Sequence, residues 1–264
     1  MNRLAPSRLT RWIIGALVAA FFLIPLGSTL LYTFQMPDGS ATLAHWTSLA
    51  DPESAAKLRP VWTGLTNSFV LAVVTVTIVL FVLAPTMILV NLRFPRVKAL
   101  FEFVALLPIS IPAIVLVVGL APIYLSIARS IGTGSWTLAF AYGITVLPFA
   151  YRSIQASIDA ADLKTLSEAA RSLGAGWPTV VLHVLAPNIR QGLLAGSLLS
   201  IAVVLGEFTI ASLLNRDVFQ TSMLVVSKQD PYLPAIFTLL ALTLCFVLLL
   251  IIGRVGRGIR KAQP

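Results

Sequence analysis

The chain has 264 residues, of which 58% are hydrophobic and only 11% charged, and its mean hydropathy is +0.92. A soluble protein needs more charged residues to cover its surface, so this composition excludes a soluble globular domain and indicates a protein embedded in lipid. The net charge of +9 does not indicate nucleic-acid binding, because the basic residues lie in short segments between apolar runs rather than along one Lys/Arg-rich helix.

Apolar runs long enough to cross a bilayer occur at six places in the sequence. A hydrocarbon core about 30 Å thick needs about 20 helical residues to cross it. The sequence therefore predicts an all-α, polytopic membrane protein with a single transmembrane domain over residues 1–264. The six predicted spans are, in chain order, 12–34, 67–90, 99–124, 135–151, 192–214 and 235–253.

The first span follows several arginines, as the apolar region of a signal peptide does, but its apolar run is longer and no convincing small-residue cleavage site follows. We expect an uncleaved anchor. Three spans contain prolines, namely Pro25, Pro85, and the pair Pro108 and Pro112. Proline removes a backbone donor and bends a helix, so these positions predict either packing geometry or a bent helix that lines a pathway.

The distribution of basic residues predicts the orientation of the spans. If the N-terminus is cytoplasmic, most of the 19 Lys and Arg residues fall in the inner segments, in agreement with the positive-inside rule. The outer segments then contain only Lys57, Arg59, Arg129, Arg216 and Lys228. Six spans place both termini in the cytoplasm, as the basic C-terminal tail also requires.

The long inner segment between the fourth and fifth spans predicts a helical hairpin. Asp162 can cap a helix start, and Leu163, Leu166, Ala170 and Leu173 recur at spacings of three and four, which predicts one apolar stripe. Glu168 and Arg171 lie off this stripe, three residues apart, and can pair. Gly174 and Gly176 end this helix, and Pro178 suits the first turn of a second helix that runs towards Pro187. From these residues alone, the hairpin could lie along lipid headgroups or dock in a groove of a soluble partner.

The segment "EAARSLGAGWPTVVLHVLAP" resembles the EAA loop of permease subunits of binding-protein-dependent ABC importers. In that family the pattern is E-A-A, three residues, G, nine residues, and I-x-L-P. Val184 and Ala186 replace the isoleucine and the leucine of the pattern, and both remain apolar. The residues that match it are Glu168, Ala169, Ala170, Gly174 and Pro187.

The resemblance implies the type I (MetI-like) permease fold, with the loop at about residues 159–187 acting as the element that couples to an ATPase. It implies that Glu168–Arg171, Gly174 and Pro187 meet a separate ATP-binding subunit. The sequence contains no GxxxxGK[ST] phosphate loop, so we expect no cofactor in this chain, no enzyme activity, and ATP bound by a separate subunit. The resemblance implies that two such ATP-binding subunits act together. The other expected partners are a second permease, identical or homologous, an extracytoplasmic solute-binding protein, and the bilayer of a bacterial inner membrane.

Glu207 is the acidic residue placed deepest in a predicted span. Fifteen residues beyond Gly192, at 1.5 Å each, it lies about 22 Å into the membrane. A buried acid is costly, so Glu207 is expected either to face a pathway for a cationic substrate or to have a structural role, through a hydrogen bond or by extending to the outer interface. The "IPAIVL" and "GEF" segments resemble permeases for polyamines, thiamine, ferric ions and aminoethylphosphonate, and a polyamine is the first expectation. The other candidate pathway residues are Ser110, Pro112, Thr145 and Ser200.

Three other classes of protein compete with this interpretation. A secondary, ion-coupled transporter is the main one, but it does not need the hairpin and commonly shows internal repeats. A membrane enzyme would need convergent catalytic groups, which the spans lack. A non-transporting assembly protein could also use a cytoplasmic hairpin, and ATP-dependent uptake would distinguish it.

Overall fold

The computed structural model describes residues 7–261, and the side chains of residues 7–244, 246 and 247 within them. Within this part of the chain the regular secondary structure is helical, and one isolated β-bridge joins Gln35 and Ala41, which confirms the predicted all-α class. The chain forms two compact units, one made of the residues up to Arg59 with those from Met223 onward, and one of Pro60–Ser222. The predicted orientation also uses five basic residues whose side chains are not among those described, namely Arg3, Arg254, Arg257, Arg260 and Lys261.

The first unit contains three helices, α1 (Arg8–Tyr32), the short α2 (Ala44–Thr47) and α14 (Tyr232–Lys261). α1 contacts α14, and at this contact the ring of Tyr232 stacks on Tyr32 and on His45. α1 buries none of its residues although it is apolar on all sides. A helix of this kind is covered by lipid or by other helices, as expected for the first span.

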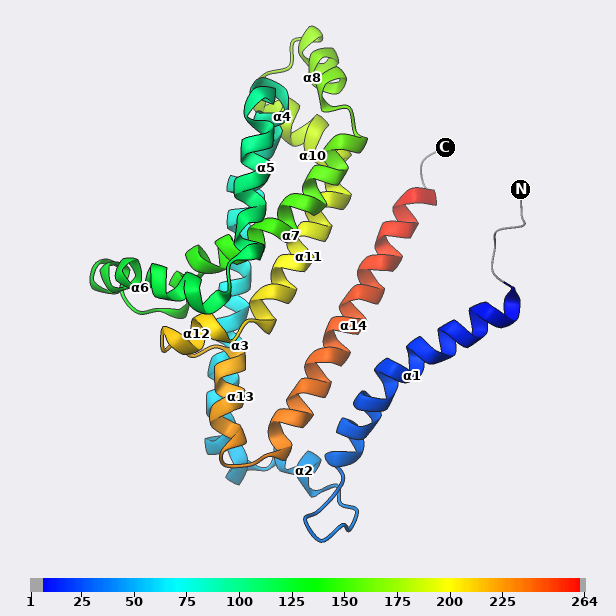
Figure 1. The fold of residues 1–264 in the computed structure, drawn as a ribbon, viewed down its shortest axis with the longest axis vertical. Helices are drawn as coiled ribbons and strands as arrows, with labels where there is room; N and C mark the ends of the chain where they lie inside the picture. Colours follow the sequence, from blue (N-terminus) through cyan, green and yellow to red (C-terminus); the bar gives the residue numbers. More distant parts are fainter. Residues whose placement is uncertain (1–6, 262–264) are drawn as a thin grey trace. The chain divides into compact units, whose positions relative to one another are not determined.

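The second unit begins within α3 and includes the first part of α13 (Figure 1). Two stretches of π-helix, Val79–Leu83 and Val180–Leu185, interrupt its α-helices. Short 3₁₀ turns lie at Pro95–Val97, Leu107–Ser110 and Ser135–Leu138 in this unit, and at Ser48–Ala50 and Pro52–Ser54 in the first. The helices are α3 (Ala55–Ile78), α4 (Ala84–Arg93), α5 (Lys98–Leu106), α6 (Ala113–Ser130), α7 (Ala139–Ala160), α8 (Leu163–Ser172), α9 (Trp177–Thr179), α10 (Ala186–Asn188), α11 (Arg190–Gly206), α12 (Thr209–Leu213) and α13 (Phe219–Ser227).

The core of the second unit is built on the contact between α7 and α11, which run side by side. Small residues allow this approach: a Cβ atom added to Gly192 would lie 2.7 Å from the carbonyl oxygen of Ser153. The large buried side chains around the contact include Tyr142, Tyr151 and Ile154 of α7. α7 continues past the predicted end of the fourth span at residue 151, because Ile154 and Ile158 keep one face of the helix buried.

The prolines explain where these helices depart from α-geometry. Pro85 follows the π-helix Val79–Leu83, and Pro187 follows the π-helix Val180–Leu185. A proline cannot donate to the carbonyl four residues earlier and its ring clashes with that carbonyl, so a wider π turn ahead of the proline relieves both problems. The second predicted span lies within a continuous helical stretch, Pro52–Arg93.

The span predicted over residues 99–124 is not one bent helix. α5 ends in a 3₁₀ turn, Ile111 is extended with φ −102° and ψ 119°, and α6 starts after Pro112 in a new direction (Figure 1). Pro108 and Pro112 both lack a donor, and the second also disfavours the α conformation at Ile111. The span predicted over 192–214 is broken as well, since α11 ends at Gly206 and α12 begins at Thr209.

By length and apolar composition alone, three helices among the described residues could cross a membrane, Arg8–Tyr32, Pro52–Arg93 and Ala113–Ser130. A fourth would be the pair Trp177–Asn188 and Arg190–Gly206, which is bent by 77°. The number of six spans and the single domain therefore remain predictions.

Candidate functional site

The first helix of the hairpin, α8, starts at a cap that the sequence predicts. The carboxylate of Asp162 accepts hydrogen bonds from the backbone nitrogen of Thr165 at 3.4 Å and from its hydroxyl at 2.8 Å. Asp162 has a φ of 40°, a left-handed conformation that Asp tolerates better than most residues. Leu163 is buried, and Leu166 and Ala170 pack against the same core. Three members of the predicted stripe thus hold α8 against the unit.

The turn after α8 exposes the fourth member of that stripe. Leu173 is 89% exposed, so the fourth member of the predicted stripe does not pack on the unit with the other three. The reason is the turn itself: Leu173 is the C-cap of α8 and Gly174 follows at a φ of +85°. The amide of Gly174 donates to the carbonyl of Arg171, and the amide of Ala175 donates to that of Ala170. These two bonds form a Schellman motif, which glycine favours because it adopts positive φ without strain.

The outward face of α8 contains the residues of the EAA motif. Glu168 and Ala169 are exposed, as is Arg171, whose guanidinium lies 4.8 Å from the centre of the Trp177 ring. Within the described residues no ion pair joins Glu168 to Arg171, so the predicted pairing of these side chains is not formed. The carboxylate of Glu168 is therefore available to a partner.

The second half of the hairpin starts at Trp177, with Pro178 in its first turn as predicted, and continues through the π-helix to α10. Val180 and Leu185 are buried, whereas Leu182 is 63% exposed and Pro187 is also exposed. The hairpin thus has a packed inner side and an uncovered outer side that includes Leu173 and Leu182. It lies at one end of the second unit, beyond α4 and α7 (Figure 1).

Glu207 lies in the break between α11 and α12 rather than within a helix. Its backbone is extended, with φ −81° and ψ 126°, and its side chain is partly buried. The Tyr142 hydroxyl donates to Oε2 of Glu207 at 2.8 Å, and the backbone nitrogen of Ile210 lies 3.0 Å from both carboxylate oxygens. Of the two expected roles of Glu207, the structural hydrogen bond is present.

Within the described residues, no hydrogen bond joins Glu207 to the other candidate pathway residues. Ser110 and Pro112 are exposed at the α5–α6 break. The hydroxyls of Thr145 and Ser200 each donate to a carbonyl of their own helix, that of Tyr142 and that of Gly196. What the structure does bring together are the two broken spans, because α6 packs against α12.

Sequence reasoning missed Tyr142 as the partner of Glu207. A tyrosine within an apolar span needs a partner for its hydroxyl when it is buried, and Glu207 is the acid placed deepest in a predicted span. These two facts together could have suggested the pair. The sequence does not, however, reveal which turn of α7 faces the break.

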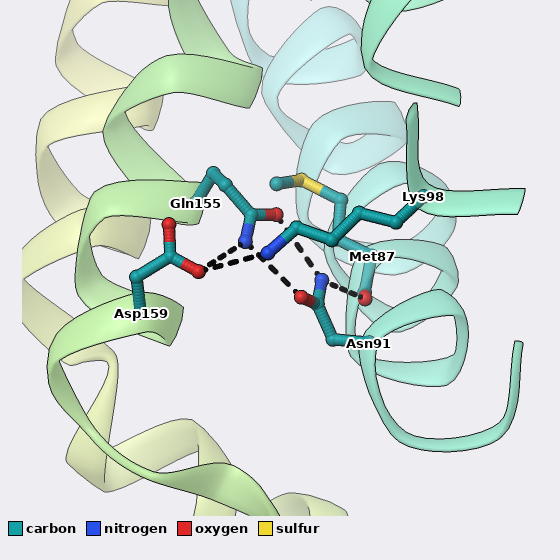
Figure 2. A network of polar contacts seen from close by, with 5 residues as sticks. All are labelled: Met87, Asn91, Lys98, Gln155 and Asp159. Carbon is teal, nitrogen blue, oxygen red and sulfur yellow. Dashed lines mark hydrogen bonds and ion pairs between the residues drawn. The ribbon is translucent and has the colours of Figure 1, made fainter. Parts of the chain in front are cut away.

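A second polar cluster, also missed, joins three helices near the hairpin end of the unit (Figure 2). The side-chain amides of Asn91 on α4 and Gln155 on α7 each donate to the other's oxygen, at 3.1 Å in both directions. Gln155 also donates to Asp159 at 2.8 Å, and Lys98 at the start of α5 pairs with the same oxygen of Asp159 at 3.0 Å. In the sequence, only the spacing of Gln155 and Asp159 on one helix face indicates a contact.

Among the described residues no group of His, Cys, Asp and Glu is arranged to hold a metal ion. The arrangement of the site is that of a binding surface at the hairpin and of a helix break in the bundle.

Comparison with known proteins agrees with this description. Residues 85–261 match the family described as the binding-protein-dependent transport system inner membrane component. A probable ABC transporter permease protein of Sinorhizobium fredii, y4fN, is 30% identical over 139 residues, which is 52% of this chain and 24% of that protein. The chloroplast sulfate permease 2 of Chlamydomonas reinhardtii is 35% identical over 96 residues, 36% of this chain and 26% of that protein.

The chain thus spans about a quarter of the length of each of these two relatives. A third relative, the spermidine/putrescine transport system permease protein PotB of Haemophilus influenzae, is 25% identical over 231 residues, 79% of this chain and 78% of that protein. The family match covers the hairpin and the helices on both sides of it, and it confirms the resemblance carried by Glu168–Pro187. This chain belongs to the family of binding-protein-dependent transport system inner membrane components.

Proposed function

We propose that this chain forms half of the translocation pathway of an ABC importer. The hairpin at residues 159–187 couples the chain to the conformational changes of a separate ATPase. The observation that carries the proposal is the uncovered outer side of the hairpin, with Leu173 89% exposed at its turn. Beside it, the carboxylate of Glu168 is free of ion pairs within the described residues, and Ala169 is small enough to permit close approach.

An ATP-binding subunit is the partner that fits this surface. Burying a leucine side chain contributes about 1.5–3 kcal/mol, so Leu173 can serve as an apolar anchor in a cleft of that subunit. Arg171 and Trp177 stack on each other and make the flank of the turn rigid. We include Arg171, Gly174 and Pro187 in this surface because they shape the turn and the end of the second helix.

The rest of the importer follows from the same proposal. This sequence lacks a phosphate loop, so ATP is bound by a separate subunit, which acts as a dimer in the proposed importer. A second permease, identical or homologous, supplies the other half of the pathway, and a solute-binding protein delivers the substrate from outside. The chain then crosses a bacterial inner membrane several times with both termini in the cytoplasm, and it binds lipid rather than nucleic acid.

The test is a mild-detergent pull-down of the chain from its native membrane, followed by mass spectrometry. The unaltered chain should bring down an ATPase with a phosphate loop, and Leu173→Asp should lose it. Leu43→Asp is the matched control, since Leu43 is 64% exposed in the first unit, in the segment predicted to be outside. Equal ATPase recovery with Leu173→Asp, or no ATPase with the unaltered chain, would contradict the proposal.

For the substrate, we propose a polyamine. The similarity to a spermidine/putrescine permease supports it, and so does the acid Glu207 between the broken spans. The bonds from Tyr142 and Ile210 leave acceptor capacity on Oε1, because a carboxylate offers about four lone-pair sites. Ser110 and Pro112 at the other break are proposed to line the same route, and Thr145 and Ser200 stay as weaker candidates. Thiamine, ferric ions and aminoethylphosphonate are the alternatives.

Glu207→Gln separates charge from hydrogen bonding, because a glutamine oxygen can still accept from Tyr142 and Ile210. With spermidine as substrate in proteoliposomes, ATP-driven uptake should fall about tenfold, equivalent to 1.4 kcal/mol of lost attraction. Excess sulfate should not compete. Unchanged uptake in Glu207→Gln, or inhibition by sulfate and not by spermidine, would assign the pathway to another substrate.

A further inference from the structure

The polar cluster of Asn91, Lys98, Gln155 and Asp159, here called the inner network, ties α4, α5 and α7 together (Figure 2). It runs from a buried end to an exposed end. Gln155 is only 7% exposed, Asn91 is half-buried, and the side chains of Lys98 and Asp159 are 36% and 57% exposed. An exposed ion pair contributes little by itself, so the buried amides are the part of the network that determines geometry.

The amides of the inner network use all their donors. Asn91 donates one N–H to the carbonyl of Met87 and the other to Gln155, while Gln155 donates to Asn91 and to Asp159. A flip of either amide would place two donors or two acceptors face to face. A shift of α7 along α4 would therefore separate the paired amides of Asn91 and Gln155.

The inner network also lies where the bundle turns into the hairpin. Asp159 is three residues before Asp162, the residue that caps α8, and α7 ends between them at Ala160. α8 in turn contacts α4, and its first residue, Leu163, is buried in the same core. A force applied to α8 thus reaches α4 and α7 at the level of the inner network.

We propose that Asn91, Gln155, Asp159 and Lys98 are positioning residues that make α4, α5 and α7 move as one body when the hairpin is displaced. The inference rests on the proposed coupling function of the hairpin. A shift of α7 along α4 would leave buried amide groups without partners, which is costly in a low-dielectric interior. The network therefore transmits motion of the hairpin to three helices instead of allowing α7 to slide alone.

The first test is the double variant Asn91→Leu/Gln155→Leu in proteoliposomes with the ATPase and the binding protein. Replacing both amides by apolar groups leaves no unpaired partner between them, so the bundle is expected to assemble. ATPase recovery and ATP hydrolysis should be retained, while solute transported per ATP should fall at least about fivefold, the lower end of typical coupling between sites. Thr86→Val is the matched control, because Thr86 bonds only within its own helix, to the carbonyl of Val82.

An unchanged ratio of transport to hydrolysis in the double variant would overturn the inference. If the unaltered chain brings down no ATPase, the proposed function is contradicted instead. Failure of the inference and failure of the proposed function are therefore distinguishable. A merely structural role would lower the amount of complex without changing the ratio, and this outcome would also overturn the inference.

The second test keeps Asn91 and Gln155 but replaces Lys98 and Asp159, which removes the ion pair and the acceptor of one Gln155 donor. Lys98→Cys/Asp159→Cys is prepared with Cys245→Ala, which removes the chain's one natural cysteine. The paired cysteines should lower transport per ATP, and a short bifunctional methanethiosulfonate cross-link should restore it, because α5 and α7 are proposed to move together. If the cross-link instead abolishes transport, α5 and α7 must move relative to each other and the inference is wrong.

Discussion

The hairpin and the helix break beside Glu207 treat their exposed or polar side chains differently. At the hairpin these side chains point outward, whereas at the break they form hydrogen bonds within the unit. Leu173 and Glu168 find no partner within the described chain, although the backbone of the same turn is fully bonded by its Schellman motif. The carboxylate of Glu207, by contrast, receives Tyr142 and the start of α12. A rigid turn that presents unpartnered side chains indicates a surface awaiting another protein, while a satisfied break indicates a joint within the bundle.

The largest effect is expected from Gly174→Pro, which tests whether the hairpin turn is needed for coupling. Proline cannot adopt the φ of +85° found there, and it removes the amide that donates to the carbonyl of Arg171. We expect ATP-driven uptake to be abolished while the protein still inserts and the bundle still folds, because Leu173 and Gly174 are exposed and only the small side chain of Ala175 in this turn touches the core.

The measurement for Gly174→Pro is uptake of labelled solute, normalised to the amount of chain in the membrane. Gly176→Ala serves as its control, since Gly176 has a φ of −72° and an added Cβ would meet only Pro178 at 3.9 Å. Normal uptake by a well-expressed Gly174→Pro chain would show that the turn is not part of coupling.

Tyr142→Phe tests whether the hydrogen bond to Glu207 stabilises the break between α11 and α12. It removes the donor to Glu207 without leaving a cavity, and a hydrogen bond to a charged group contributes about 1.5–3 kcal/mol. Thermal unfolding in detergent should show a loss of stability of this size, with ATPase recovery in the pull-down unchanged. A variant as stable as the parent would mean that Ile210 alone satisfies the carboxylate, and lost ATPase recovery would mean that the joint and the hairpin are not separate.

The same contrast explains how far sequence reasoning reached. The hairpin is encoded locally, by a capping Asp162, an apolar stripe and Gly174, so its helices and turn were predicted from neighbouring residues. The exposure of Leu173 was not, because the helical spacing continues one residue past the point where the turn rotates the chain.

The breaks and the inner network depend on residues far apart in the sequence. Asn91 and Gln155 are 64 residues apart, and Tyr142 and Glu207 are 65 residues apart. Which face of α7 meets α4 or the break follows from packing of the whole unit, which no local pattern specifies. The proline pair in the third span predicted a bend, but the packing of α6 against α12 could not be read from it.

The smallest effect is expected at the start of the hairpin, where Asp162 combines a cap with a left-handed φ of 40°. Asp162→Asn should behave as the parent, because Asn keeps the acceptor and tolerates this conformation. Asp162→Gly should lose only a few tenths of a kcal/mol, whereas Asp162→Ala loses the cap, about 1 kcal/mol, and adds the strain of a left-handed alanine, about 1–2 kcal/mol.

Trypsin cleavage after Lys164 and Arg171, both exposed on α8, measures local opening of the hairpin in these variants, which global unfolding would not detect. The order Asn, Gly, Ala in increasing cleavage supports the described cap, and bound ATPase should suppress the differences if the hairpin is its docking surface. Equal cleavage of all three variants, with or without ATPase, would mean that the hairpin is held by its buried leucine and the following turn rather than by the cap.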